Sequence, residues 1–222
     1  MANVSAGVLA APLSFGDELA SSVIHGLGIV LSIAGLAILV AFAALHGNAL
    51  TVVACTVFGA SLVLLYTAST LYHSIPIHAA KPTLRALDHI AIYVLIAGTY
   101  TPFTLIALPG AVGWTLFVAV WLLALAGSAL ELGLLRRYHK WAVALYIGMG
   151  WIGMLAFKPL SDHLQTGGTW LLIAGGLAYT LGVPFYLWRR LPYHHALWHG
   201  FVLTGSVLHY FAVLLYVIPA AA

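Results

Sequence analysis

The chain has 222 residues, of which 63% are hydrophobic and only 6% are charged, and its mean hydropathy is +1.06. This composition excludes a soluble globular domain and predicts an integral membrane protein. The formal net charge is +3, but the basic residues lie in separate short loops, so the charge does not indicate nucleic-acid binding.

Seven apolar stretches are each long enough to cross a bilayer, which takes about 20 residues. Their runs are continuously apolar rather than alternating, which favours helices over strands. The sequence therefore predicts an all-α, seven-transmembrane helical bundle forming one integral-membrane domain over residues 1–222. In chain order the expected spans are roughly 22–45, 49–74, 86–108, 112–134, 141–157, 168–188 and 196–218, the fifth being the shortest.

The basic residues predict the orientation of the bundle. Only Lys158 falls on the side that carries the C-terminus. The N-terminal side holds the other seven, because loops 2–3, 4–5 and 6–7 lie there: Lys81, Arg85, Arg136, Arg137, Lys140, Arg189 and Arg190. Since cytoplasmic loops are enriched in Lys and Arg, we expect the N-terminus in the cytoplasm and the C-terminus outside.

Polar side chains fall at the predicted cytoplasmic ends of three spans. The second span ends with Ser69 and His73, the third opens with Asp88, and the seventh opens with His195 and His199. The last two lie one helical turn apart on one face, a spacing that suits two nitrogens on one metal ion. Polar groups in hydrocarbon cost a few kcal/mol unless something binds them, so these residues form a candidate site, provided that the three helices are neighbours.

Neutral histidine side chains are well suited as zinc ligands. His73, His195 and His199 would supply three ligands, and three ligands with an open fourth position are typical of catalytic zinc. Asp88 could then hold a water on the metal or act as general base, while Ser69 could orient a ligand or stabilise an oxyanion.

Each residue also has a structural interpretation. Asp88 can instead pair with Arg85 or stabilise the start of its helix, and Ser69 can be a small residue at a helix contact. Glu131 is expected to reach nearby basic residues, Arg136 and Arg137, as an interfacial ion pair. The remaining loop histidines are interpreted as interfacial or hydrogen-bonded side chains: His46, His78, His139, His163 and His194.

Three further polar residues lie inside spans. Glu18 and His25 are two turns apart on one helix face, where they either line the same cavity or cap and anchor the first helix. His209 lies about 15 Å deeper than His199 along the helix, too far to share a metal. A pocket-lining or helix-bridging role fits His209 better.

Three segments carry a family resemblance. Ser69–Ser74 (STLYHS), Leu87–Phe103 (LDHIAIYVLIAGTYTPF) and His195–Tyr210 (HALWHGFVLTGSVLHY) resemble the bacterial hemolysin III branch of the progestin and adipoQ receptor family, within a likeness spanning about residues 17–217. In that family a Ser-x3-His, an Asp and a His-x3-His build a zinc site near the cytoplasmic face.

The resemblance implies that the three histidines bind zinc, with Asp88 and Ser69 beside the metal. It further implies a multi-pass protein of the inner (plasma) membrane, and similarity to a wider group of membrane zinc hydrolases that includes ceramidases. Ser21 and Ile24 depart from the Asn and Thr of many eukaryotic members, which puts the role of the first helix in doubt.

Two functions remain open. The first is a zinc-dependent hydrolase of lipid amides or esters, with membrane lipid as substrate. The second is a non-catalytic protein of membrane homeostasis or sensing in which zinc braces the helices. The fourth position on the zinc distinguishes them. A water molecule there, with Asp88 behind it, favours the hydrolase, whereas direct ligation by Asp88 without a cavity favours the bracing role. Pore formation or haemolysis ranks last, because no charged ring or polar stripe runs through the spans.

Overall fold

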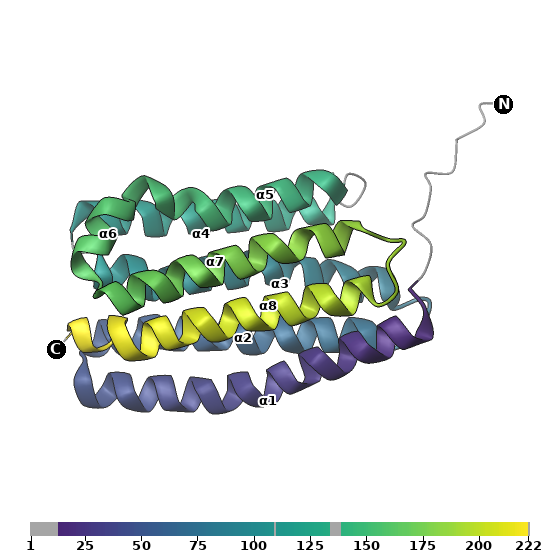
Figure 1. Ribbon diagram of the computed structural model, residues 1–222, viewed down its shortest axis with the longest axis horizontal. Helices are drawn as coiled ribbons and strands as arrows, with labels where there is room; N and C mark the ends of the chain where they lie inside the picture. Colours follow the sequence, from purple (N-terminus) through teal and green to yellow (C-terminus); the bar gives the residue numbers. More distant parts are fainter. Residues whose placement is uncertain (1–12, 109, 134–138, 222) are drawn as a thin grey trace.

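The computed structural model describes residues 13–108, 110–133 and 139–221, which form a bundle of long helices lying side by side (Figure 1). No strand occurs in these ranges. The helices are α1 (Phe15–His46), α2 (Ala49–Ser74), α3 (Lys81–Pro102), α4 (Ala111–Leu132), α5 (His139–Trp151), α6 (Phe157–His163), α7 (Thr166–Leu187) and α8 (His194–Ala212).

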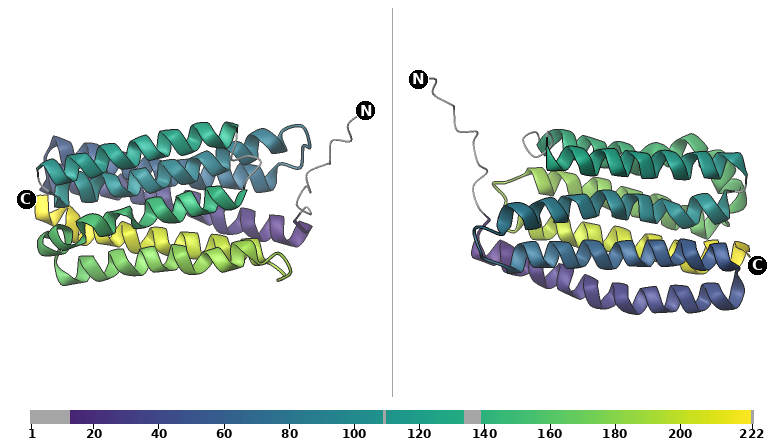
Figure 2. Two further views of the ribbon diagram at one scale, coloured as in Figure 1. Left: turned by 90° about the horizontal axis from the view of Figure 1, so that it is seen from above. Right: turned by 180° about the vertical axis from the view of Figure 1, so that it is seen from behind.

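Seven helical segments of the described chain are long and apolar enough to cross a membrane, which confirms the predicted fold class. Three of them are interrupted or extended helices. α3 continues through a π-helical turn to Ala107, α8 continues through another to Val217, and α5 and α6 together make the fifth span. The first span begins at one end of the bundle and the last span ends at the other (Figure 2).

The first helix begins seven residues earlier than the predicted span. Ser14 caps it, because its hydroxyl oxygen accepts a hydrogen bond from the backbone N–H of Asp17 at 3.1 Å. Such a cap, followed by the acidic residues Asp17 and Glu18, stabilises a helix N-terminus. The extra two turns place these carboxylates within the bundle rather than in a tail.

The fifth span contains a break. A 3₁₀ segment, Ile152–Ala156, separates α5 from α6, and the span extends to His163 rather than to the predicted residue 157. Tyr100 of α3 stabilises the break, since its hydroxyl donates to the carbonyl of Gly150 at 2.8 Å and accepts from the N–H of Gly153 at 2.9 Å. The glycines lower the helix propensity there.

Glycines bring two helix pairs into close contact. A Cβ at Gly28 of α1 would lie 2.5 Å from the ring of Tyr66 on α2, and one at Gly175 of α7 would lie 2.2 Å from the ring of His209 on α8. Only glycine allows these approaches. His209 then donates from Nε2 to the carbonyl of Leu172 at 3.0 Å and also lines the internal cavity, so the predicted helix-bridging and pocket-lining roles both hold.

Neighbouring helices do not all pack equally closely. α1 packs against α2 and α8, α2 against α3, α3 against α4, and α7 against α8, whereas α5 makes fewer contacts with α3, α4 and α7. At one end of the bundle α1, α3 and α8 begin and α2 and α7 end (Figure 1). We call this the basic end, because Lys81, Arg85, Arg189 and Arg190 lie there.

The orientation of the bundle can be tested by cysteine labelling. In a Cys55→Ala background, we expect a cysteine at Arg189 to react only with a membrane-permeant thiol reagent and a cysteine at Ala222 to react with an impermeant one, because the basic end should face the cytoplasm. Labelling of intact cells measures both. Equal accessibility from the same side would contradict the seven-span topology.

Candidate metal centre

Three histidines from two helices meet at the basic end of the bundle. His73 ends α2, and His195 and His199 lie in the first two turns of α8. One ring nitrogen from each lies within 4.8 Å of the other two. His73 and His199 are buried, while His195 is partly exposed to the cavity. The structure thus brings together the three residues predicted as ligands, although α8 packs mainly on α7 and α1 rather than on α2.

The spacing of these nitrogens fits a tetrahedral ion. Nε2 of His73 and Nε2 of His199 lie 3.1 Å apart, and two ligands at usual Zn–N distances would be separated by about 3.3 Å. A cation between them lets both nitrogens act as electron-pair donors. The buried Nδ1 of His199 has no partner among the described residues, so the donor set is compatible with one zinc ion held by three histidines.

Glu18 of α1 supports this cluster. Its Oε2 accepts a hydrogen bond from Nδ1 of His73 at 2.5 Å, and its Oε1 accepts one from Nζ of Lys81 at 3.0 Å. Lys81 also donates to the backbone carbonyl of Tyr72 at 2.6 Å. A carboxylate on the far nitrogen of a histidine fixes the ring and its tautomer, which leaves Nε2 of His73 directed at the metal position.

Asp88 and Ser69 lie next to the triad. Asp88 is 6% exposed, and its carboxyl lies beside the Ser69 hydroxyl of α2 and close to His73. No ion pair within 4 Å joins Asp88 to Arg85, although both belong to the described chain. The ion-pair interpretation of Asp88 is therefore wrong, and its carboxyl remains available to the cavity that it lines.

His25 of α1 is a fourth histidine at the cluster. Its ring lies against that of His199, with centroids 3.7 Å apart, and meets Tyr66 edge-on at 5.0 Å. Both His25 and Glu18 line the cavity, which confirms one of the two roles predicted for them. Because the buried ring of His25, 2% exposed, packs directly against His199, it restricts the orientation of that side chain.

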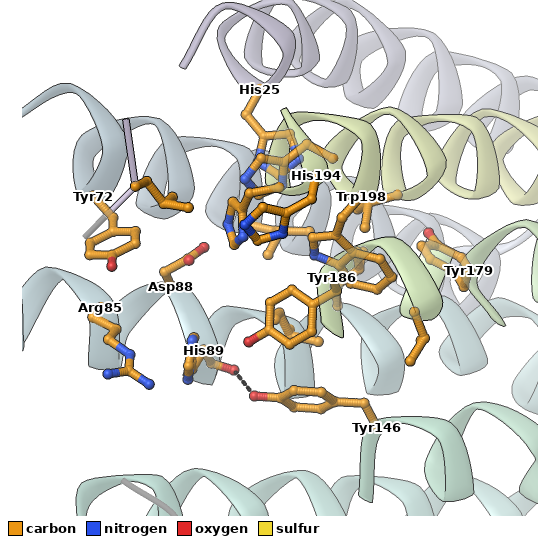
Figure 3. A pocket seen from close by; sticks show the side chains of 18 of the residues that line it. His25, Tyr72, Arg85, Asp88, His89, Tyr146, Tyr179, Tyr186, His194 and Trp198 are labelled. Carbon is orange, nitrogen blue, oxygen red and sulfur yellow. Dashed lines mark hydrogen bonds between the residues drawn. The ribbon is translucent and has the colours of Figure 1, made fainter. Parts of the chain in front are cut away.

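A cavity of about 900 Å³ is lined by two histidines of the triad, His195 and His199. It runs between α3, α5, α7 and α8 from the basic end down to His209, and its deeper wall is largely apolar, including Leu95, Ile96 and Val202. Figure 3 shows Asp88 on the side of the cavity near His25, with His89 and Tyr186 farther along its wall. The site is therefore accessible to an elongated apolar molecule with a polar end.

A second buried pair lies across the cavity. Nδ1 of His89 donates to Oε1 of Glu131 at 2.8 Å, and the Tyr146 hydroxyl donates to the His89 carbonyl at 3.3 Å (Figure 3). Glu131 is only 2% exposed, so its carboxylate is buried in the bundle, whereas an interfacial position was predicted. Its proposed partners, Arg136 and Arg137, lie outside the described residues.

The fold and the site together define a seven-span membrane protein with a buried histidine triad of metal-binding geometry. Comparison with known sequences identifies its family: the profile of the Haemolysin-III related family matches residues 13–210. The chain therefore belongs to this family.

Curated relatives agree with this assignment. Hemolysin-3 of Bacillus cereus is 48% identical over 206 residues, which cover 93% of this chain and 94% of the relative. The hemolysin-3 homolog of Bacillus subtilis strain 168 is 47% identical over 200 residues, covering 90% and 94%. A more distant relative is the human monocyte to macrophage differentiation factor, 29% identical over 168 residues, covering 72% and 68%.

We expect purified protein to contain one zinc ion per chain, since three nitrogens converge on one point. Elemental analysis by mass spectrometry measures the ratio. The double variant His195→Ala, His199→Ala should lose the metal, because it retains only one ligand. Protein without a stoichiometric transition metal, or a double variant with unchanged metal content, would contradict this assignment.

Glu18→Gln should lower zinc affinity by about 10- to 100-fold, because removing the carboxylate behind a ligating histidine lowers its basicity and its order. Competition with a calibrated chelator measures the change. Glu131→Gln is the matched control, since it alters a buried Glu–His pair outside the triad and should leave zinc affinity unchanged. Equal effects of the two substitutions would show that Glu18 acts only on general stability.

Proposed function

We propose that this protein is a zinc-dependent hydrolase of lipid amides or esters, working at the basic end of the bundle on the cytoplasmic side of an inner (plasma) membrane. The observation that carries the proposal is a cavity of about 900 Å³ that is lined by two histidines of the triad, His195 and His199, and by Asp88. A triad that served only to brace helices would need no such space.

The walls of the cavity suit a lipid. Ile92, Leu95 and Val202 offer apolar surface to a hydrocarbon chain, while the charged residues of the lining gather at the basic end. A lipid whose chain fills the deep part of the cavity would place its amide or ester group at the level of His195 and Asp88. Holding the reacting groups in this arrangement lowers the entropic part of the barrier.

Each residue of the site would have its own role in hydrolysis. When bound by the triad, zinc supplies a Lewis acid that polarises a carbonyl and makes water more acidic. Asp88 would accept the proton of the attacking water on a carboxylate oxygen and return it to the leaving amine or alcohol as the C–N or C–O bond breaks, and Ser69 would orient that carboxylate through its hydroxyl. Glu18 holds His73 in position through its Nδ1 hydrogen bond.

A structural role for the metal is the alternative, and the origin of the ligands favours it. His73 comes from α2 and the other two from α8, helices that pack mainly on other neighbours. A bound ion would join them and so stabilise the bundle, since the free energy of metal binding adds to that of folding.

Asp88→Asn distinguishes these two functions. If Asp88 is a general base, the variant should retain its zinc and its melting temperature but hydrolyse lipid at least about 10²-fold more slowly. Turnover can be followed with fluorescent ceramide and fluorescent acyl-ester substrates in nanodiscs, alongside zinc content and thermal unfolding.

Asp162→Asn is the matched control, because this exposed carboxylate pairs with Lys158 far from the triad and should change neither property. A decrease in both zinc content and melting temperature in Asp88→Asn, together with wild-type protein that cleaves none of these lipids, would replace the hydrolase proposal by the bracing one.

A further inference from the structure

The mouth of the cavity carries an arginine without an anionic partner. Arg85, in the second turn of α3, is partly buried and lines the cavity. Among the described residues, no carboxylate lies within ion-pair distance of its guanidinium. A partly desolvated cation gains most from an anion, and the planar guanidinium matches a carboxylate or phosphate with two parallel hydrogen bonds.

Three acidic residues line the same cavity, but none of them forms an ion pair with Arg85. Glu18 is held by His73 and Lys81. Asp17 lies at the N-terminus of α1, where its Oδ2 accepts a hydrogen bond from the Ser14 hydroxyl at 3.3 Å. Asp88 lies beside Ser69, one helical turn deeper in the membrane than Arg85. None of them neutralises Arg85 by direct contact.

Other groups around Arg85 also favour an anion. The Tyr72 hydroxyl of α2 points toward Arg85 in Figure 3, and Arg189 and Arg190, in the segment between α7 and α8, line the same cavity. We call Tyr72, Arg85, Arg189 and Arg190 the anion cradle. Its members come from three separate segments and line the same cavity at the basic end, with Arg189 and Arg190 exposed.

We propose that the anion cradle binds the carboxylate or phosphate group of an amphiphile whose hydrocarbon chain enters the cavity. This deepens the proposed function, on which it rests for the position of the bond to be cleaved. Arg85 precedes Asp88 by three residues, or about 4.5 Å along the helix, so the anionic group would lie just outside the reacting carbonyl. The preferred substrates would then be anionic lipids rather than neutral ceramide.

Binding can be measured without turnover. Trp198 lines the cavity and packs against Tyr186, with ring centroids 5.5 Å apart, so a brominated chain in the cavity should quench its fluorescence. Brominated stearate and brominated stearyl alcohol would be titrated into protein in neutral phosphatidylcholine nanodiscs. Trp198→Phe identifies the part of the quenching that arises at Trp198, since Trp151 also lines the cavity.

We expect the carboxylate to bind about tenfold or more tightly than the alcohol, as a charge-assisted hydrogen bond requires. Arg85→Gln should remove this preference and leave alcohol binding unchanged, and Arg85→Lys should keep part of it. Lys158→Gln is the charge-matched control on an exposed side chain outside the cavity, and it should retain the full preference. A folded Arg85→Gln protein that still prefers stearate would overturn the proposal.

Two further experiments identify which group of the ligand binds and where it binds. His195→Ala, His199→Ala protein should keep the preference, because the cradle contains no metal ligand; loss of the preference there would assign the carboxylate to the metal and overturn the proposal. Inorganic phosphate and acetate should displace stearate only weakly. Displacement by phosphate as effective as by an unlabelled anionic lipid would overturn the assignment to a lipid headgroup. Neither experiment depends on hydrolysis, so the hydrolase proposal can fail while this one stands.

Discussion

Polar atoms inside a bilayer have no water to bind, so each of them must find its partner within the protein. The histidine cluster meets this constraint through one contact, the hydrogen bond from His73 to Glu18. It joins α2 to α1, aligns Nε2 of His73 with Nε2 of His199, and connects the cluster to Lys81. The early start of α1 at Phe15 is what allows this contact, because a helix beginning at residue 22 would not contain Glu18.

The number and type of the spans follow from hydropathy, because the thickness of hydrocarbon sets both the length and the composition of a crossing helix. The helix ends follow from local hydrogen bonds that hydropathy does not register. Ser14 extends α1 beyond its apolar run, and Tyr100 of another helix stabilises the break in the fifth span. The second of these is a tertiary contact, so no reading of residues 141–163 alone could have predicted it.

In the site, too, some features could be predicted from the sequence and others depend on tertiary contacts. Three histidines at one end of two spans were sufficient to predict the triad, since their depth follows from the topology. The partners of Glu18 and Glu131 were not predictable in this way, because each lies on another helix: His73 is 55 residues from Glu18, and His89 is 42 residues from Glu131. For Glu131, closeness in sequence suggested Arg136 and Arg137, which lie outside the described residues, and gave no indication of its partner His89. Burial against α3 determines the actual one.

The triad also joins two helices that lie far apart in the sequence. His73 and His199 are 126 residues apart, and α8 is the last span to leave the ribosome. The cluster therefore cannot exist during synthesis of the first six spans, when His73 and Glu18 must persist without the histidines of α8. Completion of the metal centre thus coincides with completion of the bundle, and an ion bound there would close a very long chain loop and oppose its reopening.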